Sequence, residues 1–242
     1  MAKCALITGG TRGIGRSVAF CLAKSGFNLV LTYASDEINA KVTADKISDE
    51  TGVKVSVIRA DISNKQSIDD IAQYLFAQSF MLDAVVFNAG LTYRASFEAM
   101  GLAEWERIFF ANVHFPVFLI QKIITRLNSG GSIVFTGSLL GIEPHATSLS
   151  YGVSKSAVHA LTTNLVKFLS PYQIRVNAVA PGFVDTEWQK DKPQEIRRNI
   201  EQKLALERFC DPDELAEVYK MLVENSYFDG EIIKVSGGYL YK

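Results

Sequence analysis

Three side chains near the middle of the chain have the types and spacing needed to move a proton. Tyr151 and Lys155 are four residues apart in a segment predicted to be helical, so both side chains project from one face. Ser138 ends a strand-like run shortly before them, at the sheet edge where α/β folds place ligands. A Tyr and a Lys on the surface of an amphipathic helix are the alternative, because this spacing alone is a weak signal.

The chemistry of this trio follows from the acidity of a phenol. A tyrosine has a pKa near ~10, and lowering that pKa by about three units requires ~4 kcal/mol of preferential phenolate stabilisation. The Lys155 ammonium and the positive ring of an oxidised nicotinamide both favour the phenolate, and Ser138 can donate a hydrogen bond to a reacting oxygen. We therefore predict that Tyr151 exchanges a proton with a substrate while a cofactor moves a hydride.

A glycine-rich turn follows the first strand-like run and opens the first predicted helix. It reads Thr8-Gly-Gly-Thr-Arg-Gly-Ile-Gly15 and does not match the G-x-G-x-x-G spacing. Glycines let the backbone turn sharply and approach a pyrophosphate, which free N–H groups and the helix dipole stabilise. A tight turn without a ligand is the alternative, but the first strand–helix junction of such folds binds dinucleotides. The candidate contacts are Gly9, Thr11, Arg12, Gly13, Ile14 and Gly15.

The end of the second strand-like run predicts which dinucleotide is bound. An NAD enzyme usually carries an acidic residue there for the ribose 2′-hydroxyl, and this chain has Ser35 near that position. Asp36 follows and is predicted to cap the next helix. Arg12 in the glycine-rich turn can contact a 2′-phosphate instead. The sequence therefore favours NADP(H) as the cofactor.

Short apolar runs alternate along the chain with longer helical patterns. The runs are residues 4–8, 28–33, 54–58, 83–87, 132–136, 174–179 and 231–235, and the helical patterns are about 13–25, 36–50, 64–79, 102–127, 150–169 and 212–224. Nearly continuous apolar strands are typical of a sheet covered on both faces. We predict an α/β fold over residues 1–242, a single-domain, Rossmann-type, doubly wound parallel sheet of about seven strands with helices on both faces. Its longest irregular stretch is about 181–193, and we expect about 183–206 to be a loop or helical segment that binds the substrate.

Composition excludes several classes of partner. The chain has 242 residues and a formal net charge of −1, so it offers no broad basic field for nucleic acid. Its three cysteines show no CxxC spacing and fit a reduced cytoplasmic protein, and its histidines, His114, His145 and His159, predict no metal site. The apolar stretch 108–124 is interrupted by polar residues and fails as a membrane span.

These motifs together resemble the short-chain dehydrogenase/reductase superfamily. Besides the glycine-rich turn and the trio, the chain carries Asp61, Asn88-Ala-Gly90, Asn112, Pro181-Gly182 and Thr186 at matching places. The resemblance implies that Asn112 completes a catalytic tetrad with Ser138, Tyr151 and Lys155 by holding a water near Lys155. It also implies that Asp61 contacts the adenine and that Val184 and Thr186 face the nicotinamide carboxamide. The full set of implied cofactor residues adds Ser35, Ile62, Asn88, Ala89, Gly90, Tyr151, Lys155, Pro181 and Gly182 to those of the turn.

Within the superfamily the chain is most similar to 3-oxoacyl-[acyl carrier protein] reductases. The carriers of this likeness include the TRGIG turn, Asn177-Ala-Val-Ala-Pro-Gly-Phe183, Arg208-Phe209 and the ending Gly230 to Gly238. It implies reduction, in fatty acid synthesis, of a 3-oxoacyl thioester that acyl carrier protein or CoA presents. Another ketone, a steroid or a sugar alcohol is an alternative substrate, and a non-catalytic NADP-binding sensor or scaffold is an alternative of another class. Tyr93, Phe183 and Trp188 are candidates for an apolar substrate slot.

Two helices are expected to build a homotetramer. The predicted helices that hold Asn112 and Tyr151 are apolar beyond one stripe. The apolar residues are Phe109, Phe110, Phe115, Phe118, Val158, Leu161, Leu165 and Phe168. Related enzymes associate through these two helices.

Overall fold

Seven parallel strands form one sheet, in the order β3-β2-β1-β4-β5-β6-β7. The structure, a computed structural model, describes residues 2–144, 146, 148–190, 192–239 and 241, so His145 lies outside the described residues. The strands are β1 (Cys4–Thr8), β2 (Asn28–Tyr33), β3 (Val55–Arg59), β4 (Leu82–Phe87), β5 (Leu127–Thr136), β6 (Arg175–Pro181) and β7 (Ile232–Val235). The predicted doubly wound parallel sheet is confirmed, and its order reverses between β1 and β4, where such folds bind ligands.

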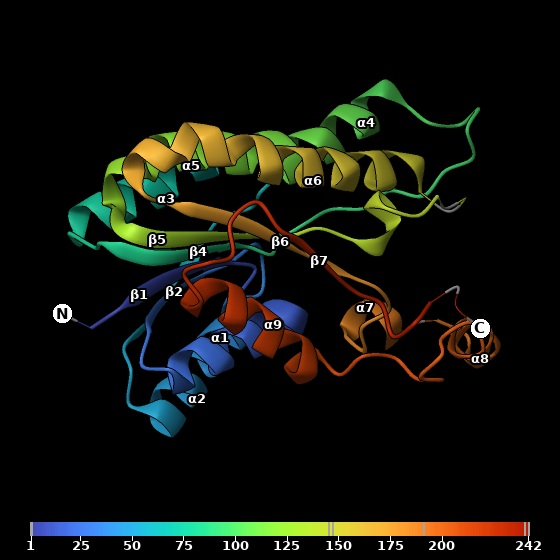
Figure 1. The fold of residues 1–242 in the computed structure, drawn as a ribbon, viewed down its shortest axis with the longest axis horizontal. Coiled ribbons are helices and arrows are strands. Elements are labelled where there is room, and N and C mark those ends of the chain that lie inside the picture. The colour runs from blue at the N-terminus through green and yellow to red at the C-terminus, as the bar shows by residue number, and fades with distance from the viewer. Residues whose placement is uncertain (1, 145, 147, 191, 240, 242) are drawn as a thin grey trace.

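Helices cover both faces of the sheet (Figure 1). One layer contains α1 (Gly13–Lys24), α2 (Glu37–Thr51) and α9 (Pro212–Glu224), and the other contains α3 (Gln66–Ala77), α4 (Leu102–Phe109), α5 (Phe115–Ile123) and α6 (Leu149–Leu169). The predicted cap at Asp36 is confirmed, because its side chain accepts a hydrogen bond from the Asn39 N–H at 3.0 Å. Asp211 and Glu214 form a capping box at the start of α9.

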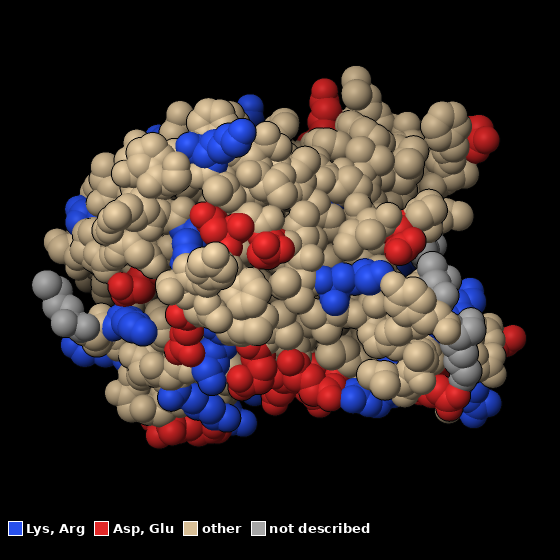
Figure 2. All heavy atoms as spheres, in the orientation of Figure 1, with Lys and Arg blue, Asp and Glu red and all other residues tan. Residues whose placement is uncertain are grey.

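Charge is mixed rather than segregated on the surface. Figure 2 shows Lys and Arg interspersed with Asp and Glu over the lower half of the view, where α1, α2 and α9 lie, and fewer charges over α5 and α6. Most ion pairs among the described residues join exposed side chains, such as Lys41 with Glu37 and Arg107 with Glu104. Exposed pairs of this kind contribute little, about 0–1 kcal/mol each. Stability therefore depends mainly on the apolar layers.

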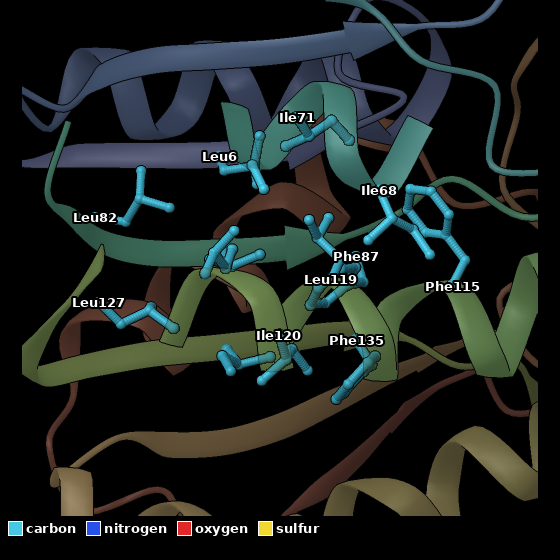
Figure 3. Close-up of a cluster of buried hydrophobic side chains, with 14 of the residues drawn as sticks. Leu6, Ile68, Ile71, Leu82, Phe87, Phe115, Leu119, Ile120, Leu127 and Phe135 are labelled. Atoms are coloured by element: carbon cyan, nitrogen blue, oxygen red, sulfur yellow. The ribbon is translucent and has the colours of Figure 1, made fainter. Parts of the chain in front are cut away.

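Apolar side chains from β4, β5 and α5 pack between the sheet and the upper helices (Figure 3). Phe87 and Phe135 stack with ring centroids 5.2 Å apart, and Phe115 and Leu119 of α5 are fully or almost fully buried in the same cluster. Burying a side chain of this size contributes roughly 1.5–3 kcal/mol. This packing fixes the carboxyl ends of β4 and β5 relative to α5.

The predicted long helix 102–127 is interrupted. A π turn, Phe110–His114, separates α4 from α5, and a short 3₁₀ turn ends at Arg126. Pro116 explains the interruption, because it has no N–H for the carbonyl of Asn112, four residues earlier, and its ring crowds that carbonyl. The whole run Leu102–Arg126 has the length and composition of a membrane-crossing helix, but 44% of its most apolar window is buried inside the protein. The core helix of a soluble protein can have the same length and composition.

Two short helices occupy the expected substrate-binding segment, about 183–206. They are α7 (Glu187–Lys190) and α8 (Gln194–Glu201), and neither buries a residue. Figure 1 places both beyond the carboxyl ends of β6 and β7, at the end of the molecule opposite the N-terminus. They are short and polar, which explains why periodicity missed them.

Candidate active site

The glycine-rich turn joins β1 to α1 and is packed too closely for side chains. A Cβ atom on Gly15 would lie 2.3 Å from the Gly9 carbonyl oxygen, so the helix can begin here only with glycine. The Asn88 side-chain amide donates to the carbonyl oxygens of Thr8 and Gly9, both at 3.2 Å. The Asn88-Ala89 segment after β4 thus holds the turn in place at the point where the strand order reverses.

The other side of the turn is held by α2 and by the segment after β6. Asn39 Nδ2 and Thr43 Oγ1 donate to the Thr11 carbonyl oxygen at 3.1 and 3.2 Å. A Cβ on Gly13 would lie 3.4 Å from the Thr186 Cγ2 atom, so Thr186 reaches the turn from β6. Three segments distant in sequence therefore shape one backbone cradle suited to a pyrophosphate.

The cations near the expected ribose position include one that sequence reasoning missed. Arg12 and Ser35 are both exposed, and in the described part of the chain Arg12 forms no ion pair. Arg59 at the end of β3 donates from Nε to the Ala34 carbonyl oxygen at 3.2 Å, next to Ser35. The signal was available, because β3 pairs in parallel with β2 and its last residue lies beside Tyr33. Arg12 and Arg59 are therefore the candidates for a 2′-phosphate.

Three predicted cofactor residues have other contacts in this structure. Asp61 Oδ1 accepts from the N–H and hydroxyl of Ser63, both at 2.8 Å, which is the role of a turn former. Ile62 is buried in the core below the sheet edge. Val184 is only 4% exposed and packs in the core cluster that includes α1 and α9, so its side chain does not face an open cradle. The Val184 backbone also forms an isolated parallel bridge with Cys210.

The structure brings Ser138, Tyr151 and Lys155 together at the end of β5. Lys155 is buried and donates from Nζ to the Thr136 carbonyl oxygen at 2.6 Å, and the same Nζ lies 5.6 Å from the centroid of the Tyr151 ring. The Ser138 side chain hydrogen-bonds the Tyr151 side chain, which acts to lower the tyrosine's pKa. Ser138 Oγ also accepts from the Leu140 N–H at 3.1 Å. A phenol, a hydroxyl and an ammonium thus converge on one point.

In the protein alone, burial and the hydrogen bond from Ser138 set the acidity of Tyr151. Burial raises the pKa of Tyr151 to about 12, and the hydrogen bond from Ser138 offsets this only in part. Burial also lowers the pKa of Lys155 to about 8. The predicted lowering, by Lys155 together with the ring of an oxidised nicotinamide, concerns the protein with its cofactor bound and stays a prediction. Tyr151 is protonated at neutral pH, as a proton donor must be.

Asn112 in the π turn uses its whole side-chain amide to fix the neighbouring loop. Its Nδ2 donates to the Leu91 carbonyl oxygen and to Ser154 Oγ, both at 2.9 Å, and its Oδ1 accepts from the Leu91 N–H at 2.8 Å. This network ties the loop after β4 to α6, one residue before Lys155. The side chain is thereby committed to structure, which leaves its main-chain carbonyl for any contact with water.

A small internal cavity of about 10 Å³ lies beside this residue. Such a volume is about that needed for one water molecule. Its polar lining groups come from Thr8, Asn112, Thr136 and Lys155. The cavity is consistent with a water between Asn112 and Lys155, as the family resemblance implies.

One of the three candidate slot aromatics reaches the catalytic cluster. The ring of Trp188, on α7, lies edge-on to Tyr151 with centroids 6.4 Å apart, and its side chain is 59% exposed. Phe183 instead packs against Phe209 and Tyr239, at 5.8 and 5.4 Å between centroids. Tyr93 contributes its carbonyl oxygen, which accepts from the Ser148 hydroxyl. Trp188 is therefore the aromatic that a substrate at Tyr151 would meet.

Comparison with known proteins places the chain in a family. Residues 9–240 match the family described as Enoyl-(Acyl carrier protein) reductase. The chain is 32% identical over 240 residues to 3-oxoacyl-[acyl-carrier-protein] reductase FabG of Aquifex aeolicus, covering 98% of this chain and 96% of the relative. A short-chain dehydrogenase/reductase from Serratia marcescens superposes with a TM-score of 0.92 at 30% identity, covering 98% of each chain. A short-chain dehydrogenase from Burkholderia cenocepacia, solved in complex with NADP, superposes with a TM-score of 0.89 at 28% identity, covering 97% of this chain and 96% of the other. The chain therefore belongs to the short-chain dehydrogenase/reductase family of oxidoreductases.

Proposed function

We propose that this protein is an NADPH-dependent carbonyl reductase that acts on a 3-oxoacyl thioester. The observation that carries the proposal is the convergence of Ser138, Tyr151 and Lys155 beside a glycine-rich cradle. Two hydroxyl groups directed at one point suit a carbonyl oxygen, which gains negative charge during reduction. The NADP in the Burkholderia relative and the name of the Aquifex relative support the cofactor and the substrate class.

The chain's own groups account for the proton side of the reaction. When bound, the cofactor supplies a hydride. The turn from Gly9 to Gly15, with Thr186 above it, would hold the pyrophosphate. Ser138 donates a hydrogen bond to the substrate oxygen, and the protonated Tyr151 gives that oxygen a proton as its charge develops. Lys155 stabilises the phenolate that remains and connects it to the small cavity beside Asn112, through which a water can return a proton.

A panel of candidate substrates tests the proposed substrate class. We expect acetoacetyl thioesters on CoA and on acyl carrier protein to drive NADPH oxidation faster than diketones, steroids or keto sugars. A crotonyl thioester belongs in the panel, because the matched family carries the name of an enoyl reductase. If the 3-oxoacyl thioester is turned over no faster than unrelated ketones, the acyl assignment fails and another ketone, steroid or sugar alcohol takes its place. If the crotonyl thioester reacts faster, the group that the enzyme reduces is a carbon–carbon double bond and not a carbonyl.

NADPH is expected to bind more tightly than NADH. Arg12 is exposed and, among the described residues, without an ion pair, and Ser35 provides no carboxylate to repel a 2′-phosphate. Arg12→Ala should weaken NADPH binding and leave NADH binding nearly unchanged, as measured by fluorescence titration. Arg107→Ala, which removes an exposed arginine on α4, is the matched control. Equal affinities for the two cofactors in the unaltered protein would contradict this choice.

The assembly is proposed to be a homotetramer formed through α5 and α6. Phe168 on α6 is 72% exposed, and Phe118 on α5 is 49% exposed. Light scattering should give four times the chain mass of 26.7 kDa. Phe168→Glu should reduce that mass, because a carboxylate cannot be buried unpaired at an apolar contact. A monomer at micromolar concentration would refute the assembly.

The protein is proposed to act in the cytoplasm. Cys4, Cys21 and Cys210 are all unpaired, which fits a reducing compartment. Burial raises the pKa of Cys4 to about 11, so that thiol has little tendency to form a reactive thiolate.

A further inference from the structure

His159 is a third side chain able to bind or exchange a proton on the face of α6 that carries Tyr151 and Lys155. The three residues are spaced four apart, so they form one stripe along the helix, which we name the α6 stripe. Its members contact residues at the end of β5 and in the segment that follows it. Tyr151 hydrogen-bonds the Ser138 side chain, and Lys155 binds the Thr136 carbonyl. His159 is buried. The sequence predicted no metal site at this residue and gave it no other role.

The imidazole of His159 binds the backbone on both sides of the Ser138 side chain. The Ser138 N–H donates to His159 Nε2 at 3.3 Å. The ring also hydrogen-bonds the backbone of Gly141, an interaction that favours its protonated form. Because Nε2 accepts, Nδ1 carries the proton and donates to Gly141. The ring therefore closes the short turn that contains Ser138.

The packing leaves no room for a different arrangement. A Cβ atom on Gly137 would lie 2.2 Å from His159 Nε2, so the residue before Ser138 must be glycine while the ring is present. Burial and the positive charge of Lys155 together lower the pKa of His159. A protonated ring would have no lone pair for the Ser138 N–H. The site therefore keeps the imidazole neutral and in one tautomer.

We propose that His159 is a positioning residue that fixes the backbone of Ser138 so that its hydroxyl stays directed at the reacting oxygen. The inference rests on the proposed role of Ser138 in carbonyl reduction. It adds the reason why Ser138 keeps one orientation: its N–H is bound by His159, and its Oγ accepts from the Leu140 N–H. With both groups bound, the Ser138 O–H is directed away from its own backbone and toward Tyr151.

Two variants at His159 separate positioning from a general structural role. His159→Phe keeps a planar ring and loses both hydrogen bonds, whereas His159→Gln can accept from Ser138 and donate to Gly141 through one amide. We expect His159→Phe to lower kcat on the order of ten-fold or more with KM for the substrate nearly unchanged, because misplacement by about 1 Å is costly in catalysis. His159→Gln should recover most of that loss. Rates are normalised to the NADPH-binding sites counted by fluorescence titration, so loss of folded protein does not lower kcat.

A measurement on the unaltered protein tests the same point if His159→Phe does not fold. Nitrogen-15 NMR of the histidine rings should show one neutral imidazole protonated at Nδ1 and not at Nε2 near pH 7. A His159 ring protonated at Nε2 or at both nitrogens would overturn the proposal, as would a His159→Phe variant with kcat within two-fold of the original. A Gln variant no better than the Phe variant would also overturn it. An inactive unaltered protein with the expected tautomer would count against the proposed function instead.

Discussion

Replacing Tyr151 with Phe is expected to reduce turnover at least ~10²-fold while NADPH binding stays within a few-fold. The change removes one hydroxyl at nearly constant shape, and general acid catalysis typically contributes 10²- to 10⁴-fold. The lost group is the protonated phenol that burial holds at a pKa of about 12. Steady-state NADPH oxidation with the best substrate of the panel gives the rate, and fluorescence titration gives the cofactor affinity.

Tyr172→Phe is the matched control for this variant. Tyr172 is exposed in the turn after α6, at the opposite end of the helix from Tyr151, so the same chemical change there should leave turnover unchanged. If Tyr151→Phe retains turnover, Tyr151 is not the proton donor. A protein that binds NADPH but reduces nothing in the panel would instead be a sensor or scaffold.

Lys155→Met is expected to abolish the alkaline limb of the pH profile together with most of the activity. Burial lowers the pKa of Lys155 to about 8, so the ammonium that stabilises the phenolate is lost as the pH rises through that value. Turnover of the unaltered protein should fall above pH 8. The Met variant should be at least ~10²-fold slower and should show no such fall, because its side chain does not titrate.

Stability should change in the opposite direction over the same pH range. Lys155 has a pKa of about 8 in the folded protein and 10.5 as its ordinary value. Between these values the unfolded chain binds the proton and the folded chain does not, so the contribution of Lys155 to the free energy of unfolding rises with pH. Thermal unfolding of both proteins at pH 7 and pH 10 measures this contribution as a difference between their Tm shifts. A smaller rise in Tm for the unaltered protein than for Lys155→Met would contradict the buried, deprotonating amine.

The strands could be predicted because runs rich in apolar, β-branched residues mark them, whether they are fully buried like β1 or half-buried like β3 and β7. β1 and β2 were predicted at both ends, since all five residues of β1 and five of six in β2 are buried. β5 was predicted too short, since its first part, Leu127–Gly131, carries two exposed residues and a register irregularity in its pairing with β4. Apolar patterning therefore found the apolar parts of the strands, including half-buried β3 and β7, and missed the polar start of β5.

The site was predictable where chemistry restricts the residue type and not where packing decides. Ser138, Tyr151 and Lys155 were predicted from spacing, and the structure brings them together. The rise in the pKa of Tyr151 in the protein alone was not predictable, because it depends on how much water the fold removes from the phenol. Arg59 and His159 were missed although strand pairing and helical spacing place them near the site. Each acts through a hydrogen bond to the backbone of another segment, and the sequence does not show which backbone group a side chain will meet.

The segment that carries α7 and α8 is anchored in the apolar core at its two ends. Val184 anchors its start, and Leu204 and Phe209 anchor its end, all three buried, whereas the two helices between them bury nothing. Substitutions at exposed positions usually change stability by less than about 0.5 kcal/mol. Evolution can therefore alter the residues around Trp188 with little effect on folding, whereas each member of the α6 stripe is constrained by its neighbours. Such a chain can acquire new substrates by drift while its chemistry stays fixed.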